Sequence, residues 1–145
     1  MKYRKDEGEP LPDPFLYRQL VGSLIYLTIT RPDISYVVHI VSKFMQAPRH
    51  LHLVAVRRII RYLIGSPTRG LFFPTQSTLN LTSYSDADWA GCPDTRKSIT
   101  GWCIFLGDAL ILWKCKKQDC VFKFSTEAEY RAMSAACSEI MWLRG

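Results

Sequence analysis

The second half of the chain is organised around residues 84–91, YSDADWAG, which close a run of alternating apolar and polar residues that begins at Leu79. Such alternation is typical of a half-buried β-strand. The turn-forming sequence Gly91-Cys92-Pro93-Asp94 would then end this unit. The pattern therefore predicts a strand over residues 79–85, with Asp86 at its end.

Two more strands and a helix are predicted downstream. Residues 99–106 and 110–116 have the composition of strands, and Gly107-Asp108 between them is a two-residue hairpin signal. Ser125-Thr126 precedes Glu127-Ala128-Glu129, which indicates a helix that is capped at its start and continues to the end of the chain. The second half therefore follows the order β-β-β-α.

Upstream, helical periodicity replaces the alternation. Apolar residues recur at helical spacing over residues 15–28, 33–47 and 50–64, with Asp33 capping or opening the second of these helices. A short aromatic strand is expected at residues 71–73. The predicted fold class is α+β, an N-terminal helical segment followed by the β-β-β-α unit.

Three parts are expected along the chain: a flexible lead-in over 1–13, a helical segment over 14–74 and a β-rich domain over 75–145. Hydrophobic residues make up 48% and charged residues 22%, which fits a globular protein and excludes a disordered one. There is no apolar run long enough to span a membrane and no secretory signal at the N-terminus. We therefore expect an intracellular protein whose five cysteines are reduced.

The formal charge of +6 is concentrated in the first half of the chain. There is no Asp or Glu between Asp33 and Asp86, while the third predicted helix carries Arg57, Arg58 and Arg61. A polyanion such as nucleic acid would be attracted to this segment. The alternative is a basic helix face that is simply solvated.

Two carboxylates have settings that suit metal binding. Asp86 ends a predicted strand and Glu129 lies in the first turn of the helix after the third strand. If this helix packs across the sheet, the two side chains could converge, and converging carboxylates bind Mg²⁺, which activates water for phosphodiester cleavage. The alternative is ordinary structure, with Asp86 ending a strand and Glu129 interacting with the helix dipole.

Five stretches resemble, in their order along the chain, the downstream Pol region of copia-type long-terminal-repeat retrotransposons. They are YRQLVGSLIYL (17–27), TRPDI (30–34), YSDADWAG (84–91), WKCKKQ (113–118) and TEAEYRA (126–132). The resemblance implies that the helical part is a thumb or connection segment at the end of a reverse transcriptase, which grips template and primer. The β-rich part would be the first half of an RNase H domain, which cuts the RNA strand of an RNA–DNA hybrid with Mg²⁺.

The same resemblance assigns roles to the two carboxylates. Asp86 corresponds to the first catalytic aspartate and Glu129 to the helix glutamate, and both would be metal ligands. The Tyr-x-Asp-Asp motif of the polymerase is absent from the sequence. The later acidic ligands of the nuclease would follow Gly145, so the RNase H unit is expected to be incomplete.

Three hypotheses remain open from the sequence. The first is a Pol polyprotein fragment that is inactive alone and keeps nucleic-acid binding through Arg57, Arg58, Arg61, Lys116 and Lys117. The second is a Mg²⁺-dependent RNase H that acts on RNA–DNA hybrids once a partner or a further segment completes it. The third is a domesticated protein-interaction module. In each case the strand that ends at Asp86 should be an open sheet edge, which favours self-association.

Overall fold

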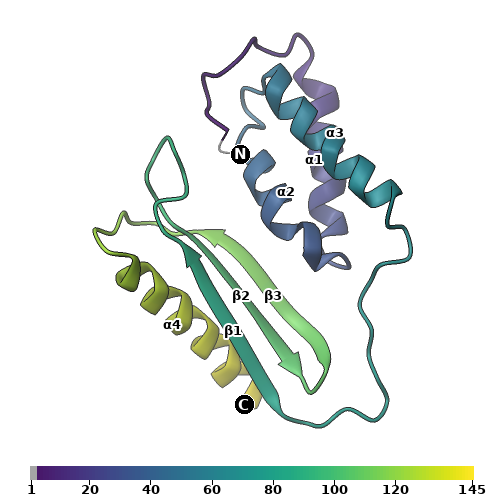
Figure 1. Cartoon of the computed structure of the whole chain (residues 1–145), viewed down its shortest axis with the longest axis vertical. Coiled ribbons are helices and arrows are strands. Elements are labelled where there is room, and N and C mark those ends of the chain that lie inside the picture. The colour runs from purple at the N-terminus through teal and green to yellow at the C-terminus, as the bar shows by residue number, and fades with distance from the viewer. Residues whose placement is uncertain (1–2) are drawn as a thin grey trace. The chain divides into compact units, whose positions relative to one another are not determined.

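The computed structural model describes residues 3–145, and the chain divides between Gly70 and Leu71 into two compact units, each described here by itself. Unit 1 is helical and unit 2 combines a sheet with one helix (Figure 1). The elements of unit 1 are α1 (Pro14–Leu27), a 3-10 turn η1 (Pro32–Ile34), α2 (Ser35–Ser42) and α3 (His50–Ile64).

The first helix shows how sequence sets the structure of unit 1. The Asp13 carboxylate accepts a hydrogen bond from the Phe15 amide at 2.9 Å, and Pro14 takes the first helical position, where no amide donor is needed. Tyr17, Val21 and Leu24 are buried on one face of α1 because they recur at helical spacing.

That face contributes to the hydrophobic core of unit 1. The other buried members of the core come from the second and third helical segments: Ile34, Val38, Val41, Phe44, Leu53, Ala55, Val56 and Ile59. Residues 3–13, the described part of the predicted lead-in, are hydrogen-bonded to the residues just before α3. The Leu11 amide donates to the Pro48 carbonyl at 3.0 Å, and Arg49 Nε donates to the Lys5 carbonyl at 2.7 Å.

Unit 2 has a three-stranded antiparallel sheet in the order β1-β2-β3, so β1 and β3 are its edges. The strands are β1 (Leu81–Asp88), β2 (Ile99–Leu106) and β3 (Ala109–Lys117), and α4 (Ser125–Arg144) follows them. In the β1–β2 register, Asp86 lies opposite Gly101. Gly107 has a φ of +57° in the hairpin between β2 and β3, a conformation that glycine adopts at little cost.

The core of unit 2 forms where α4 packs on the sheet. Ala128, Ala132 and Ala136 are buried at four-residue spacing, and their small side chains let the helix approach the strands closely. Ala136 belongs to the same buried cluster as Trp102 and Ile104 of β2. The core of this unit therefore lies between α4 and the sheet, with its buried strand residues supplied by the central strand β2.

The α+β class and the order of helices and strands predicted from the sequence are confirmed. Three details of the prediction are wrong. Residues 71–73 form no strand, and β1 continues past residue 85 to Asp88, so that Asp86 lies within the strand. The residue before α4 is Phe124, and no side chain caps this helix, so the expected Ser125-Thr126 cap does not form.

The second helical segment also differs from its prediction. It begins as the 3-10 turn η1, and its α-helical part ends at Ser42 instead of near residue 47. Asp33 lies in the first turn of η1, which is one of its two predicted positions, and its carboxylate is bound by Arg31 instead of capping the helix. Within residues 3–145, the helices lack the combination of length and apolar character that a membrane span requires.

Candidate functional site

Asp86 lies on the exposed side of an edge strand. Along β1, partly buried residues alternate with exposed ones, and Asp86 shares the exposed set with Thr82 and Tyr84. Successive side chains of a strand point to opposite faces of the sheet. Leu81, which belongs to the other set, packs against the cluster of Trp102 and Ala136 beneath α4. Asp86 is therefore on the sheet face opposite to the one that α4 covers.

Glu129 is exposed near the start of α4, next to the buried Ala128. The buried side chain of Gln118 fixes this end of the helix. Its Nε2 atom lies 2.8 Å from Thr100 Oγ1 and 2.9 Å from the Ala128 carbonyl oxygen. Gln118 thus joins the first turn of α4 to the central strand, which sets the position of Glu129 relative to the sheet.

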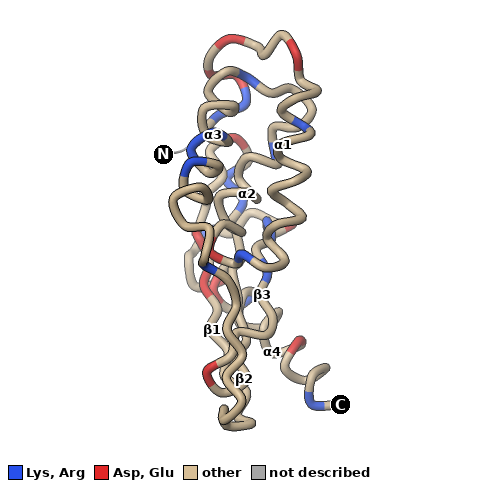
Figure 2. Tube along the Cα trace, turned by 90° about the vertical axis from the view of Figure 1, so that its right-hand side faces the viewer, with Lys and Arg blue, Asp and Glu red and all other residues tan. Residues whose placement is uncertain are grey.

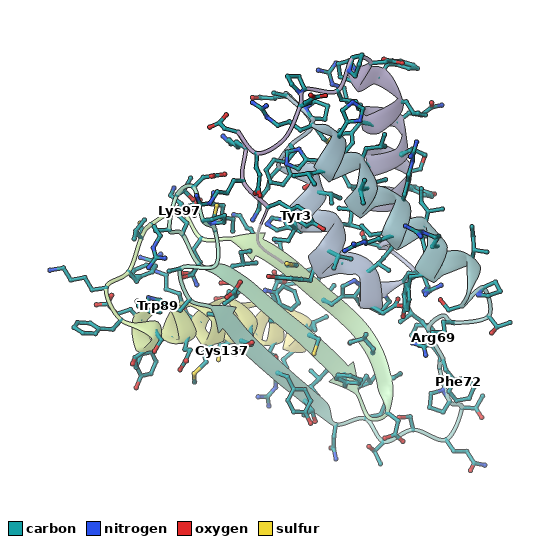
Figure 3. The ribbon with its side chains drawn as sticks, turned by 45° about the horizontal axis from the view of Figure 1, so that its top comes forward. Tyr3, Arg69, Phe72, Trp89, Lys97 and Cys137 are labelled. Atoms are coloured by element: carbon teal, nitrogen blue, oxygen red, sulfur yellow. The ribbon has the colours of Figure 1, made fainter. Side chains whose placement is uncertain are left out.

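The end of β1 and the start of α4 are joined at the same end of unit 2. Trp89, directly after β1, donates from Nε1 to the Phe122 carbonyl at 3.1 Å, and Figure 3 shows Trp89 beside the start of α4. The loop after β1 is also fixed, because the Ala90 amide donates to the buried Ser98 hydroxyl at 3.1 Å. A Cβ atom on Gly91 would overlap the Asp88 carboxylate, so a side chain at this position would force that carboxylate to move.

Asp86 and Glu129 are the two metal ligands that the sequence predicts. No group of three or more His, Cys, Asp or Glu side chains that could hold a metal ion occurs within residues 3–145. Asp86 and Glu129 lie at the same end of unit 2, but the Asp86 side chain is on the face of the sheet that α4 does not cover. Their convergence on Mg²⁺ stays a prediction. Carboxylate oxygens remain the ligand type that this ion prefers.

The predicted basic residues differ in their surroundings. Arg57, Arg58 and Arg61 are all exposed on α3, along which basic positions recur in Figure 2. Lys116 is exposed on β3. Lys117 is partly buried, and its Nζ atom donates to Cys92 Sγ at 3.3 Å, so this side chain has a structural contact.

The Lys117 contact belongs to a polar environment around Cys92 that the sequence did not reveal. Burial raises the pKa of the Cys92 thiol. Hydrogen bonds from the Thr95 hydroxyl and amide, and then from Lys117, together lower this pKa by more than burial raises it. The resulting pKa is about 7, below the usual value of 9.0. A substantial fraction of this thiol is therefore ionised at neutral pH. The only sequence signal is the turn at residues 91–94.

A second polar cluster was also missed, in unit 1. Arg31 is only 6% exposed and binds both oxygens of the Asp33 carboxylate, at 2.9 and 2.8 Å. Its guanidinium also donates to the carbonyl and hydroxyl oxygens of Ser66, at 2.9 and 3.1 Å, and the Tyr62 hydroxyl donates to Asp33 at 2.7 Å. The hydrogen bonds from Arg31, and then that from Tyr62, lower the pKa of Asp33 to about 2.

This cluster holds the loop between α1 and α2 against the end of α3. A hollow of about 340 Å³ adjoins it, lined by Pro32, Asp33, Thr68, Arg69 and Gly70. The sequence signal for the cluster is TRPDI at 30–34, which interrupts the helical periodicity after residue 28.

Comparison with known proteins relates the chain to the proteins of transposons. No family model matches it, and no solved structure matches it significantly. It is 50% identical over 136 residues to the retrovirus-related Pol polyprotein from transposon RE1 of Arabidopsis thaliana, covering 94% of this chain and 9% of that protein.

Two other relatives cover similar parts of the chain. Over 129 residues it is 42% identical to the retrovirus-related Pol polyprotein from transposon TNT 1-94 of Nicotiana tabacum, which covers 88% of this chain and 10% of that protein. Over 128 residues it is 41% identical to secreted RxLR effector protein 161 of Plasmopara viticola, which covers 88% of this chain and 90% of that protein. The chain spans about a tenth of the length of the two polyproteins and is a homologue of that segment of retrovirus-related Pol polyproteins from transposons.

Proposed function

We propose that the chain is a copia-type Pol fragment that joins the end of a reverse transcriptase to the first half of an RNase H domain. By itself it binds nucleic acid without sequence preference and does not cleave it. The observation that carries this proposal is the exposed arginine set on α3, Arg57, Arg58 and Arg61, in a segment without acidic residues.

The geometry of α3 supports a phosphate partner. Leu53, Val56 and Ile59 point into the core of unit 1, so the arginines are held on the outer side of a well-anchored helix. Arg57 and Arg61 are four residues apart and therefore neighbours on the helix surface. Their like charges repel, and an anion between them would remove that repulsion. A nucleic-acid backbone supplies such anions at regular spacing.

The β-β-β-α order of unit 2 supports the RNase H assignment. Asp86 lies in the first strand and Glu129 near the start of the helix, which matches the positions that the family resemblance assigns to metal ligands. Two carboxylates hold a hydrated Mg²⁺ only loosely, and positioning a second ion and the attacking water requires further ligands. We therefore expect Mg²⁺ as the cofactor of the completed domain and an RNA–DNA hybrid as its substrate.

Fluorescence anisotropy with a labelled RNA–DNA hybrid tests the binding proposal. Binding should weaken steeply with salt, and the variant with Arg57, Arg58 and Arg61 all changed to Ala should lower both affinity and the salt slope. The slope of log K against log salt should fall by up to about 2.7 if all three side chains contact phosphates, at about 0.9 per contact. DNA duplexes of two unrelated sequences should give similar affinities.

A charge-matched control distinguishes a local surface from net charge. Changing Lys5, Lys114 and Lys123 to Ala removes the same charge from exposed positions outside α3. This control should keep most of the affinity and the slope. Equal losses in the two triple variants would show that only net charge matters, and unchanged binding in the α3 variant would show that its arginines are merely solvated.

The open edge of β1 favours a second candidate function. Within residues 3–145 this strand pairs only with β2, so its outer edge can accept another strand. A completing segment, from a longer chain or from a partner, would extend the sheet next to Asp86. In that state the unit would act as a Mg²⁺-dependent nuclease on RNA–DNA hybrids.

A further inference from the structure

The outer surface of α4 carries an apolar stripe that nothing in unit 2 covers. Tyr130, Met133 and Met141 are 66%, 51% and 73% exposed, and Cys137 and Arg144 are also exposed. At 100° per residue these five positions fall within an arc of about 80°, opposite the buried alanines that face the sheet. A solvated helix face would instead be polar, so a contiguous apolar stripe indicates a contact surface.

The spacing of this stripe is symmetric about its centre. Met133 and Met141 each lie four residues from Cys137, and Tyr130 and Arg144 each lie seven residues from it. A two-fold axis through Cys137 would therefore place Met133 of one copy against Met141 of the other. It would also place Tyr130 against Arg144. A surface that is complementary to itself in this way is what a two-fold dimer requires.

The chemistry of the facing pairs agrees with this arrangement. Two methionines supply flexible apolar contact, and an arginine over a tyrosine ring gains a cation–π interaction. An antiparallel arrangement also brings acidic Glu129 near the start of one helix toward the basic end of the other, which Figure 2 shows in blue at the C-terminal end of α4. A parallel arrangement would place the like ends of both helices together.

The centre of the stripe suits a close crossing. Ser134, Cys137 and Ser138 are small and exposed, while the large side chains lie further along the helix in both directions. At an interaxial distance of about 8 to 10 Å, Cα atoms that face each other lie roughly 3.5 to 5.5 Å apart. This range overlaps the separation of about 4.4 to 6.8 Å that a disulfide bridges. Figure 3 labels Cys137 on this helix.

We propose that the exposed face of α4 binds a second copy of this chain as an antiparallel helix pair centred on Cys137. Each copy contributes only three large apolar side chains, so the interface is at the small end of specific interfaces. The dissociation constant should accordingly be roughly 10 µM to 1 mM. This surface is distinct from the open β1 edge and does not depend on nucleic-acid binding.

Sedimentation equilibrium of the reduced full chain tests the proposal, together with oxidative cross-linking. Added diamide takes two protons and two electrons from a pair of Cys137 thiols, which become one S–S bond. The Cys120→Ser variant should cross-link readily through Cys137. The Cys137→Ser variant keeps Cys120, which is also exposed and provides the matched control, and it should cross-link at least roughly tenfold more slowly.

Charge substitutions test the antiparallel register. Met133→Lys should weaken the dimer by roughly tenfold or more, because it places a cation against Met141 of the other copy. Adding Met141→Glu should restore association, since each new lysine then faces a glutamate. The Met133→Lys, Met141→Lys pair should remain dissociated. Both positions are exposed, and circular dichroism checks that each variant stays folded.

Several results would overturn this proposal. A chain that remains monomeric at about 1 mM, the upper limit of the expected dissociation constant, has no such surface. Cross-linking through Cys120 as fast as through Cys137 would indicate random collision. A dimer that is unaffected by Met133→Lys would have to use another surface, such as the β1 edge.

Discussion

The Arg31 side chain should contribute more to the stability of unit 1 than any exposed arginine. Replacing it by Ala removes two hydrogen bonds to Asp33 and two to Ser66. Breaking a buried ion pair costs about 3 to 5 kcal/mol. The Asp33 side chain is 31% exposed, so water compensates part of that loss. We therefore expect Arg31→Ala to lower the free energy of unfolding by about 2 to 3 kcal/mol.

The contribution of the Arg31–Asp33 pair should depend on pH in a defined direction. The pKa of Asp33 is about 2 in the folded chain, against a usual value of 3.8, because Arg31 binds the carboxylate form. Stabilisation from a lowered carboxylate pKa is complete above the unfolded value and is lost as the pH falls through the folded value. A double-mutant cycle of Arg31→Ala and Asp33→Asn should give a coupling of about 1 to 2 kcal/mol at pH 6, which declines between pH 3.8 and pH 2.

Urea unfolding followed by far-UV circular dichroism measures these differences. All four tryptophans lie in unit 2, so their fluorescence reports separately on the unit that does not contain Arg31. Arg69→Ala is a matched control, since Arg69 is exposed and donates one hydrogen bond to Tyr62, at 3.1 Å. It should cost less than about 1 kcal/mol. A coupling near zero at pH 6, or one that does not change down to pH 2, would refute the proposed pairing.

Two other predictions concern unit 2. The isolated chain should not cleave RNA–DNA hybrids above background in Mg²⁺ or Mn²⁺. Extension with the remaining strands and acidic ligands of a related element should restore cleavage, and Asp86→Asn or Glu129→Gln should abolish the restored activity. If the unextended chain cleaves the hybrid and Asp86→Asn removes that activity, the second candidate function is favoured. The rate of iodoacetamide labelling of Cys92 should rise with pH with a midpoint near pH 7, and burial should make the labelling slow at every pH. Lys117→Met should move this midpoint to higher pH, because it removes a hydrogen bond that lowers the thiol pKa. An unchanged midpoint would show that Lys117 does not affect the thiol.

Sequence patterns predicted those elements whose signals are local. Residues 50–64 were predicted as a helix, and α3 has these bounds, because strong periodicity ends at Gly65 and Pro67. Residues 99–106 were predicted as a strand, and β2 again has these bounds, since the Gly107-Asp108 turn marks its end. In both cases the deciding residues lie within or next to the element.

The failed predictions depended on partners distant in sequence. Residues 71–73 are aromatic but have no strand to pair with, so β propensity alone did not make them a strand. Arg31 is buried because Ser66, 35 residues away, supplies acceptors for it. Gln118, directly after β3, is buried because it binds Thr100 of β2 and the first turn of α4. Of these contacts, only those of Arg31 have a signal in the neighbouring sequence, the TRPDI stretch at 30–34, and that stretch does not indicate the distant partner Ser66.

The orientation of Asp86 was within reach of the sequence. Leu79 and Leu81 occupy odd positions of the alternating run, and Asp86 occupies an even one. Because strand side chains alternate, Leu81 and the residues that share its side of β1 face the helix, and Asp86 points to the other side. Convergence of Asp86 and Glu129 was expected from the packing of the helix on the sheet alone, without the alternation of side chains along the strand.

The alternation also limits where an ion shared by Asp86 and Glu129 could bind. The two residues belong to different sides of the sheet, so a common ligand must lie around a sheet edge and not above a face. The edge next to both is β1, alongside which α4 runs (Figure 1). Whatever pairs with that edge would control how closely the two carboxylates approach. For this reason we expect the chain alone to bind Mg²⁺ weakly and a completing strand, with its own acidic ligands, to be needed for a working metal site.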